Sequence, residues 1–536
     1  MPRVRLFRSV GQLERVSLPR MRTTVEWKGE SGEVINSDKI RLILGGPGCG
    51  KTTRLLALVA EELQSGVRPS EIAFVAFTKA AADEAIHRAS MQFKLDPKAD
   101  LPWFRTIHSL AFQSLNLARD EIMSPKDWRA FSAMVREPMK GSYETDSAFG
   151  SLSDYVKTGG NRNIGDMMLR IVDYASTTCQ SLDEAWREFG EQIDWWRLKR
   201  FADALDRYKS EVGKMDFTDI LHQFIAHQPP LNVKVAFIDE AQDLTRSQWR
   251  TVGHAFQNAE RVYIGGDDDQ AIYKWAGADV EYFLGLQGKH EILPISHRLP
   301  EAVFRLARSI VQRIGHRFEK DFTPSGRPGL IEHHRDIEEL DLRSGSWLLL
   351  ARNGYMLSEY ERLCESAGVA YRTRSGDSIN PRDVAAIRLW EGIKRGRMAS
   401  FNAEQARLLA AYLGRVRPAL RETDTFTMAS FSDWPWSELW TSCFTAIPPR
   451  IRDYYISCLR RGEKLTEPSR IRIETIHGVK GAEADHVVLC TDISSRTKET
   501  LEQTPDHEHR VFYVGATRAR ESLHILAPQT ALAYAI

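Results

Sequence analysis

The sequence lacks several features that would place it in a specialised class. Its 536 residues include only six cysteines, and no two have the CxxC spacing. This argues against a zinc ribbon, an iron–sulfur cluster or a disulfide framework. No apolar run reaches the length of a membrane span, and the basic N-terminus holds no apolar stretch long enough for a signal sequence. We therefore expect a cytoplasmic protein that does not enter membranes.

The chain also has no excess of either charge, and it contains no tandem repeats and no low-complexity tracts. Its net charge is +1, so a nucleic-acid site would have to come from local clustering of basic and aromatic residues. With 42% hydrophobic and 27% charged residues it has the composition of a globular protein. Its length exceeds what one hydrophobic core supports, which predicts two or more domains.

What is present is a repeated alternation of short apolar strands with amphipathic helices, typical of a parallel α/β sheet. Ligands on such sheets bind at the carboxyl ends of the strands, where the polar clusters of this chain fall. We predict an N-terminal arm and two α/β lobes, each with a mainly helical insertion. The predicted boundaries are 1–36 for the arm, 37–118 and 215–293 for the first lobe, 119–214 for its insertion, 294–385 and 466–536 for the second lobe, and 386–465 for its small insertion.

A phosphate-binding loop follows the first strand. The stretch GGPGCGKTT matches G-x-x-x-x-G-K-[ST] and lies between a predicted strand and a predicted helix, the context that supports the motif. Backbone N–H groups and the helix N-terminus would surround phosphate oxygens. The Lys51 ammonium would reach the β and γ phosphates, and the Thr52 hydroxyl would bind Mg²⁺. The predicted nucleotide-binding residues here are Gly45, Gly46, Pro47, Gly48, Cys49, Gly50, Lys51, Thr52 and Thr53.

The stretch FIDEAQD supplies the carboxylates that hydrolysis needs. Asp239 ends an apolar strand and is predicted to hold Mg²⁺ together with Thr52. Glu240 is placed to orient and deprotonate the attacking water. Two carboxylates at one strand end favour hydrolysis over nucleotide storage, so the sequence predicts an NTPase.

A third segment, GGDDDQAIYKWAGAD at 265–279, combines an amide with aromatic side chains. Gln270 is suited to read a phosphate, and Tyr273 and Trp275 are suited to hold flat rings. The alternative that the two rings belong to the core is kept open. Asp268 and Asp269 are interpreted as loop or helix-cap residues without assigned chemistry.

With these motifs placed, the chain resembles the UvrD/Rep/PcrA-like branch of superfamily 1 DNA helicases. The resemblance covers both lobes in the family's order. It rests on VAFTKAAADEA, RTIHSLAF, DFTDIL, DEAQD, GGDDDQAIYKWAGAD, LPISHRLP, IETIHGVKGAEADHVVL and EHRVFYVGATRARESLHIL, together with the phosphate loop.

The resemblance implies two RecA-like lobes that clamp ATP and Mg²⁺ and move 3′ to 5′ along single-stranded DNA, unwinding duplex at single-strand/double-strand junctions. By matching positions, Gln270 would sense the γ-phosphate, and Arg298 and Arg518 would act as arginine fingers from the second lobe. His297, in place of the family's tyrosine, and Glu483 would contact the nucleotide. The implied DNA contacts are Phe77, Thr78, Lys79, Thr106, His108, Tyr273, Trp275, His477 and Lys480.

The chain departs from the family pattern at several positions. No glutamine lies between Gln12 and Gln64, where the family carries an adenine-reading motif, and Ala276 stands where an arginine is common. The second insertion is much smaller than the family's regulatory subdomain. Its WPWSELW stretch at 434–440 is interpreted as a compact tryptophan core, with a partner surface as the alternative.

One other function stays open, an ATP-driven translocase or nucleotide-gated remodeller of protein–DNA complexes that does not unwind, because no strand-separating wedge is identifiable. RNA as the track is secondary, and a helicase–nuclease fusion is disfavoured because the chain ends soon after the last motor motif. DNA repair and replication are both compatible with the family, while pathway, oligomeric state and a protein loading partner are left open.

Overall fold

The computed structural model describes residues 37–139, 163–189, 193–415 and 420–536. The predicted N-terminal arm, 1–36, lies outside these residues. By its packing the chain divides into two compact units, residues 1–329 with 495–517 and residues 330–494 with 518–536. The first division falls at 329/330, beyond the lobe boundary predicted at 293/294, because 294–329 packs with the phosphate-loop unit.

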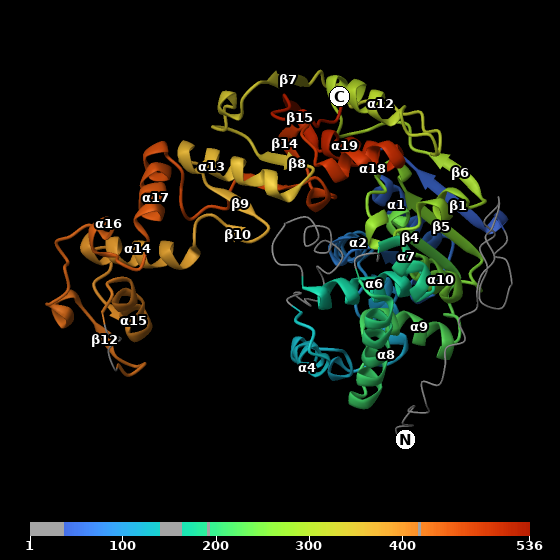
Figure 1. Ribbon diagram of the computed structural model, residues 1–536, viewed down its shortest axis with the longest axis horizontal. Coiled ribbons are helices and arrows are strands. Elements are labelled where there is room, and N and C mark those ends of the chain that lie inside the picture. The colour runs from blue at the N-terminus through green and yellow to red at the C-terminus, as the bar shows by residue number, and fades with distance from the viewer. Residues whose placement is uncertain (1–36, 140–162, 190–192, 416–419) are drawn as a thin grey trace. The chain divides into compact units, whose positions relative to one another are not determined.

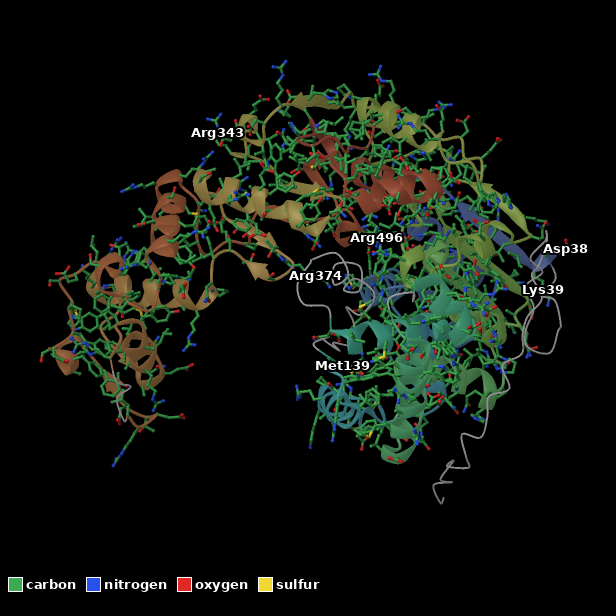
Figure 2. All side chains as sticks on the ribbon, in the orientation of Figure 1. Asp38, Lys39, Met139, Arg343, Arg374 and Arg496 are labelled. Atoms are coloured by element: carbon green, nitrogen blue, oxygen red, sulfur yellow. The ribbon has the colours of Figure 1, made fainter. Side chains whose placement is uncertain are left out.

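Unit 1 contains a six-stranded, all-parallel sheet with the strand order β3-β2-β4-β5-β1-β6. Figure 1 labels four of its strands, β4, β5, β1 and β6. Asp38 and Lys39, labelled in Figure 2, lie in the short 3-10 turn Ser37–Lys39 that immediately precedes β1. The strands are β1 (Ile40–Leu44), β2 (Ile72–Ala76), β3 (Phe104–Thr106), β4 (Val235–Asp239), β5 (Arg261–Gly266) and β6 (Lys289–Ile292). The parallel sheet predicted for the first lobe is confirmed.

Both faces of this sheet are buried, which explains the continuous apolar runs of its strands. Leu42, Val75 and Ile264 face one hydrophobic core, and Ile43 and Phe74 face the other. Helices α1 (Lys51–Gln64) and α2 (Lys79–Phe93) cover the second face. Helices α3 (Ile107–Ser114), α9 (Phe217–His227), α10 (Arg246–Ala255) and α11 (Val280–Leu284) cover the first.

Two further parts complete unit 1. Helix α12 (Glu301–Val311) packs against α19 (Pro505–Ala516), which follows α18 (Ser495–Gln503). The insertion is helical in its described residues, as predicted, with α4 (Pro125–Val135), α6 (Ile164–Thr178), α7 (Leu182–Phe189) and α8 (Trp195–Val212). These four helices surround a separate core around Phe131 and Phe201.

Unit 2 contains a seven-stranded sheet in the order β10-β9-β13-β8-β14-β15-β7. All neighbours are parallel except the β9/β10 hairpin. The strands are β7 (Leu330–His334), β8 (Trp347–Ala351), β9 (Tyr371–Thr373), β10 (Gly376–Asp377), β13 (Ile471–Thr475), β14 (Ala484–Cys490) and β15 (Ala519–Leu526). Together with helix α13 (Leu357–Ala367) they give the predicted second α/β lobe.

The insertion of unit 2 is mainly helical, as predicted. It comprises α14 (Pro381–Lys394), α15 (Ala403–Tyr412), α16 (Trp440–Cys443), α17 (Pro449–Arg461) and the hairpin β11 (Phe401–Asn402) and β12 (Thr425–Phe426). Trp390 is fully buried and stacks on Trp436 with ring centroids 4.5 Å apart. Trp434 and Trp440 are buried in the same core, which is continuous with the sheet. The tryptophan-core interpretation of 434–440 is confirmed.

Across the described ranges, no helix combines the length and hydrophobicity needed to cross a membrane. The six cysteines are all free thiols.

Candidate nucleotide and DNA site

The phosphate loop joins the carboxyl end of β1 to the N-terminus of α1, as the sequence predicts. Gly48 and Gly50 have φ values of 72° and 79°, a left-handed conformation that glycine adopts without steric cost. Their backbone leads directly into α1, so free N–H groups of the first helical turn face the loop. The Lys51 Nζ is buried and donates to the carbonyls of Gly45 at 3.0 Å and Gly46 at 3.4 Å.

A hydroxyl and a carboxylate meet beside this loop. Thr52 Oγ1 donates to Asp239 Oδ2 at 2.6 Å, which joins α1 to the end of β4. Burial, and then the neighbouring Glu240 carboxylate, raise the pKa of Asp239 to about 6. Raised proton affinity marks a buried carboxylate short of positive charge, and oxygen ligands of this kind suit Mg²⁺. Thr52 and Asp239 therefore fit the predicted metal role.

Glu240 adopts a left-handed backbone conformation with φ of 53°, unusual for a residue with a side chain. Strain of this kind gathers at functional sites, where surrounding contacts hold it. Here the holding contact is Gln242, whose Nε2 donates to Glu240 Oε2 at 2.6 Å.

Gln242, which the sequence analysis did not single out, links the two acidic segments. Its side-chain oxygen accepts from the Asp267 backbone N–H at 2.9 Å, and Asp267 Oδ2 accepts from Gln270 Nε2 at 2.5 Å. A hydrogen-bonded path thus runs from Glu240 to Gln270. Gln242 is fully buried and lies within the DEAQD motif, so the motif was the available signal.

The three consecutive aspartates are the centre of a buried ion cluster, which adds a structural role for Asp268 and Asp269, the two that the sequence left as loop or helix-cap residues. Lys320, fully buried, lies 3.1 Å from Asp267 Oδ1 and 3.0 Å from Asp269 Oδ2, and it also pairs with Asp268. Arg317 pairs with Asp269 through two hydrogen bonds of 2.7 Å. The cations come from about 50 residues downstream, a distance over which sequence patterns carry no signal.

The segment 293–298 lies against the phosphate loop. Ser296 Oγ donates to the Pro47 carbonyl at 2.6 Å, and the His297 backbone N–H donates to the Gly48 carbonyl at 2.9 Å. The Arg298 Cβ lies so close to Gly48 that no side chain fits there. Arg298 and His297 therefore belong to the same unit as Lys51, rather than to the second lobe as predicted, because this segment is hydrogen-bonded to the phosphate loop.

The predicted aromatic contacts come together at the carboxyl edge of the unit 1 sheet. Phe77 follows β2 and stacks on Tyr273 with ring centroids 5.8 Å apart. Tyr273 in turn meets Trp275 edge-on at 6.2 Å. All three side chains are half-buried, and none belongs to the fully buried core. The alternative that Tyr273 and Trp275 are interior core residues is thereby disfavoured.

The other predicted DNA contacts of unit 1 lie nearby along the same edge. Thr78 and Thr106 cap α2 and α3, accepting from the N–H groups of Ala81 and Ser109. Lys79 is exposed at the first position of α2. Burial lowers the pKa of His108 to about 4, so its imidazole is neutral at pH 7.

The remaining predicted residues belong to unit 2. His477 is buried in the turn 477–479 after β13, and Lys480 follows it. Arg518 is buried and donates from Nη1 to the Ala482 carbonyl at 3.4 Å. Glu483 forms an ion pair of 2.6 Å with Arg520 Nη2. Their nucleotide and DNA roles stay predictions.

Two protein-family models match this chain. The model of the UvrD/REP helicase N-terminal domain matches residues 27–291, and that of the UvrD-like helicase C-terminal domain matches residues 455–530.

Individual relatives are distant and longer. The ATP-dependent DNA helicase PcrA of Bacillus subtilis is 24% identical over 372 residues, covering 65% of this chain and 47% of the relative. PcrA of Leuconostoc citreum is 24% identical over 62% of this chain and 43% of its own length, and DNA helicase II of Haemophilus influenzae is 22% identical over 54% and 40%. The matched region thus spans less than half of these relatives. Among solved structures, the arterivirus nonstructural protein 10 helicase aligns with a TM-score of 0.33 at 11% identity, over 92% of this chain and 60% of its own.

Proposed function

The chain belongs to the UvrD/REP helicase family, and from that premise we propose an ATP-dependent, DNA-stimulated motor that moves 3′ to 5′ along single-stranded DNA and unwinds duplex at junctions. The observation that carries the proposal is the hydrogen bond of 2.6 Å between Thr52 and Asp239 beside the glycine loop. It brings the predicted magnesium ligands together next to the buried ammonium of Lys51.

In the proposed reaction the Lys51 ammonium moves from the loop carbonyls to the β and γ phosphates. Glu240 accepts a proton from the attacking water, and its strained backbone and Gln242 hold it in place. Arg298, from the segment against the phosphate loop, stabilises charge on the γ-phosphate. Mg²⁺ held by Thr52 and Asp239 would neutralise phosphate charge.

Coupling of ATP hydrolysis to DNA is assigned to the segment 267–275. Gln270 is hydrogen-bonded to the Glu240 path, and Tyr273 lies three residues further on, stacked on Phe77. A base stacked on an aromatic ring gains about 1–3 kcal/mol whatever its sequence, which suits a motor. A change at Gln270 is therefore transmitted along a short, largely buried segment to the rings.

The test begins with ATPase measurements on the full chain, with and without single-stranded DNA. We expect strong stimulation in the wild type and loss of turnover in Lys51→Ala and Glu240→Gln. Trp275→Ala should bind nucleotide normally but lose DNA-dependent translocation. Turnover of normal size without DNA, or unchanged stepping by Trp275→Ala, contradicts the proposal.

Single-turnover assays then separate the helicase from its alternative. Duplexes with a 3′ or a 5′ tail test unwinding and polarity, while displacement of a protein from single-stranded DNA tests translocation alone. The proposal expects unwinding from the 3′ tail. Displacement without unwinding favours the remodeller, and unwinding from the 5′ tail overturns the polarity.

A further inference from the structure

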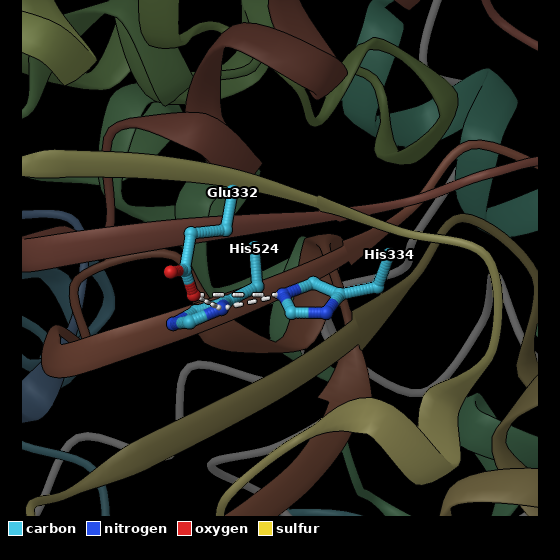
Figure 3. Close-up of side chains that lie close together, drawn as sticks. All are labelled: Glu332, His334 and His524. Carbon is cyan, nitrogen blue, oxygen red and sulfur yellow. Dashed lines mark hydrogen bonds and ion pairs between the residues drawn. The ribbon is translucent and has the colours of Figure 1, made fainter.

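A cluster of metal-ligating side chains lies far from the phosphate loop in sequence, on one face of the unit 2 sheet. Glu332 and His334 point from β7, and His524 points from the neighbouring β15 (Figure 3). Glu332 and His524 are register partners in the parallel pair, and His334 is two residues further along the same face. We propose that these three residues bind a divalent transition-metal ion of the zinc class.

The distances between the ligand atoms match a tetrahedral site. Ligands at the usual zinc distances of about 2.0–2.1 Å are separated from one another by about 3.3 Å. Here His334 Nε2 lies 3.0 Å from His524 Nδ1, His524 Nδ1 lies 3.2 Å from Glu332 Oε2, and His334 Nε2 lies 3.7 Å from Glu332 Oε2. The three atoms form one triangular face of a tetrahedron.

Each imidazole is also held from behind, as in metal sites, where the second ring nitrogen donates to a fixed partner. His524 Nε2 lies 2.8 Å from Ser522 Oγ, and Ser522 Oγ lies 2.7 Å from His486 Nδ1. The Ser522 hydroxyl can accept from His524 and donate to His486, which puts the His524 lone pair on Nδ1, facing the cluster.

The second imidazole, that of His334, is oriented in the same way. His334 Nδ1 lies 3.5 Å from the Glu339 carboxylate, so a proton on Nδ1 is favoured and the Nε2 lone pair faces the cluster. Two lone pairs and a carboxylate oxygen then point at one another. This arrangement repels itself unless a cation, or a shared proton, lies between them.

Burial supports the neutral state that metal binding requires. The side chains of His334 and His524 are 13% and 9% exposed, whereas that of Glu332 is 45% exposed and leaves an entry path. Imidazole ligands favour zinc-class ions over Mg²⁺, so this site is chemically distinct from Thr52 and Asp239. A bound ion would tie the edge strand β7 to β15.

The experiment is a titration of the full-length, tag-free protein with Co²⁺ and Zn²⁺ in a buffer containing excess Mg²⁺, which occupies the nucleotide site. We expect one equivalent of Co²⁺ to give the visible d–d absorption of a tetrahedral site, and Zn²⁺ to displace it and raise the thermal midpoint. His334→Ala and His524→Ala should weaken binding at least about 100-fold, and Glu339→Gln, behind the first imidazole, about 10–100-fold.

The matched control is His333→Ala. His333 is an exposed neighbour on the same strand, and strand alternation turns it to the opposite face, so its removal should leave binding unchanged. Glu332→Gln keeps the shape of a half-exposed side chain and therefore tests a ligand without disturbing the core. No d–d band in the wild type shows that a shared proton alone occupies the cluster. Binding that survives Glu332→Gln and both alanine variants places the ion elsewhere, and either result overturns the proposal.

Discussion

Replacing Lys320 by methionine tests whether the buried ion cluster keeps the segment 267–275 folded in place. The side chains of Lys320 and its three aspartate partners are fully buried, and the ammonium lies between the three carboxylates. Methionine keeps most of the volume and removes the charge. Arg317 remains, but its two hydrogen bonds reach only Asp269.

The expected cost follows from what the substitution leaves behind. Opposite charges about 4 Å apart near a protein surface attract by about 4 kcal/mol, and losing one partner of a buried pair costs about 3–5 kcal/mol. Asp267 and Asp268 would keep buried carboxylates without the ammonium between them. We therefore expect local unfolding of the segment to become easier by at least about 3 kcal/mol. ATP turnover should also fall, because Asp267 positions Gln270.

Hydrogen exchange measured by mass spectrometry suits this prediction, because two units need not unfold together and local stabilities are needed. Peptides covering 261–276 and 312–323 should lose protection in Lys320→Met. Lys289→Met, which removes an exposed lysine from β6, should change protection by less than about 0.5 kcal/mol. Adding Asp268→Asn to Lys320→Met should restore part of the loss, because one buried charge is removed. If Lys320→Met exchanges like the Lys289 control, the cluster does not hold the segment.

Three further predictions concern single positions. Gly50→Ala should cost about 1–2 kcal/mol of stability, because alanine is strained in the left-handed backbone conformation. Gly48→Ala should lose more stability, and also nucleotide affinity, because its Cβ would in addition meet Arg298. Equal thermal midpoints of the two variants would contradict this. Because the pKa of His108 is lowered to about 4 from an unfolded value near 6.5, its contribution to stability is complete above pH 6.5 and is lost as the pH falls toward 4. His108→Gln should therefore make the thermal midpoint depend less steeply on pH over that range. An unchanged slope would show that the imidazole stays accessible to protons. Trp390→Ala should destabilise unit 2 by about 3–5 kcal/mol in urea unfolding, whereas a loss below 1 kcal/mol would mean that the stacked tryptophans are not a core.

The sequence predicted the features that depend on local patterns. The strand–loop–helix of residues 40–64 and the parallel strands ending at Asp239 and Gly266 follow from apolar runs bounded by glycine and acidic residues. The parallel arrangement in turn predicts that these strand ends share one edge. This is why the sequence alone assigns Thr52 and Asp239, 187 residues apart, to one site.

The sequence did not predict contacts that depend on distant side chains meeting. Nothing local to Lys320 or Arg317 signals that three aspartates lie around them, since a lone lysine or arginine is usually a surface residue. The unit that contains Arg298 could not be predicted from the sequence for the same reason. The motif identified the arginine, but only the hydrogen bonds of Ser296 and His297 to the phosphate loop decide which unit contains it.

These contacts change how the segment 265–279 is understood. A loop with three adjacent carboxylates would be expected to repel itself and move, yet its aspartates are fully buried and paired with Lys320 and Arg317. The ion cluster fixes one side of the loop, so that the Gln270 amide and the Tyr273 ring are carried by the same anchored backbone. The proposed motor needs such rigidity, because a flexible segment would absorb the displacement that follows loss of a phosphate instead of passing it to the rings. Three negative charges in a row therefore serve here as anchoring points for cations from a distant segment.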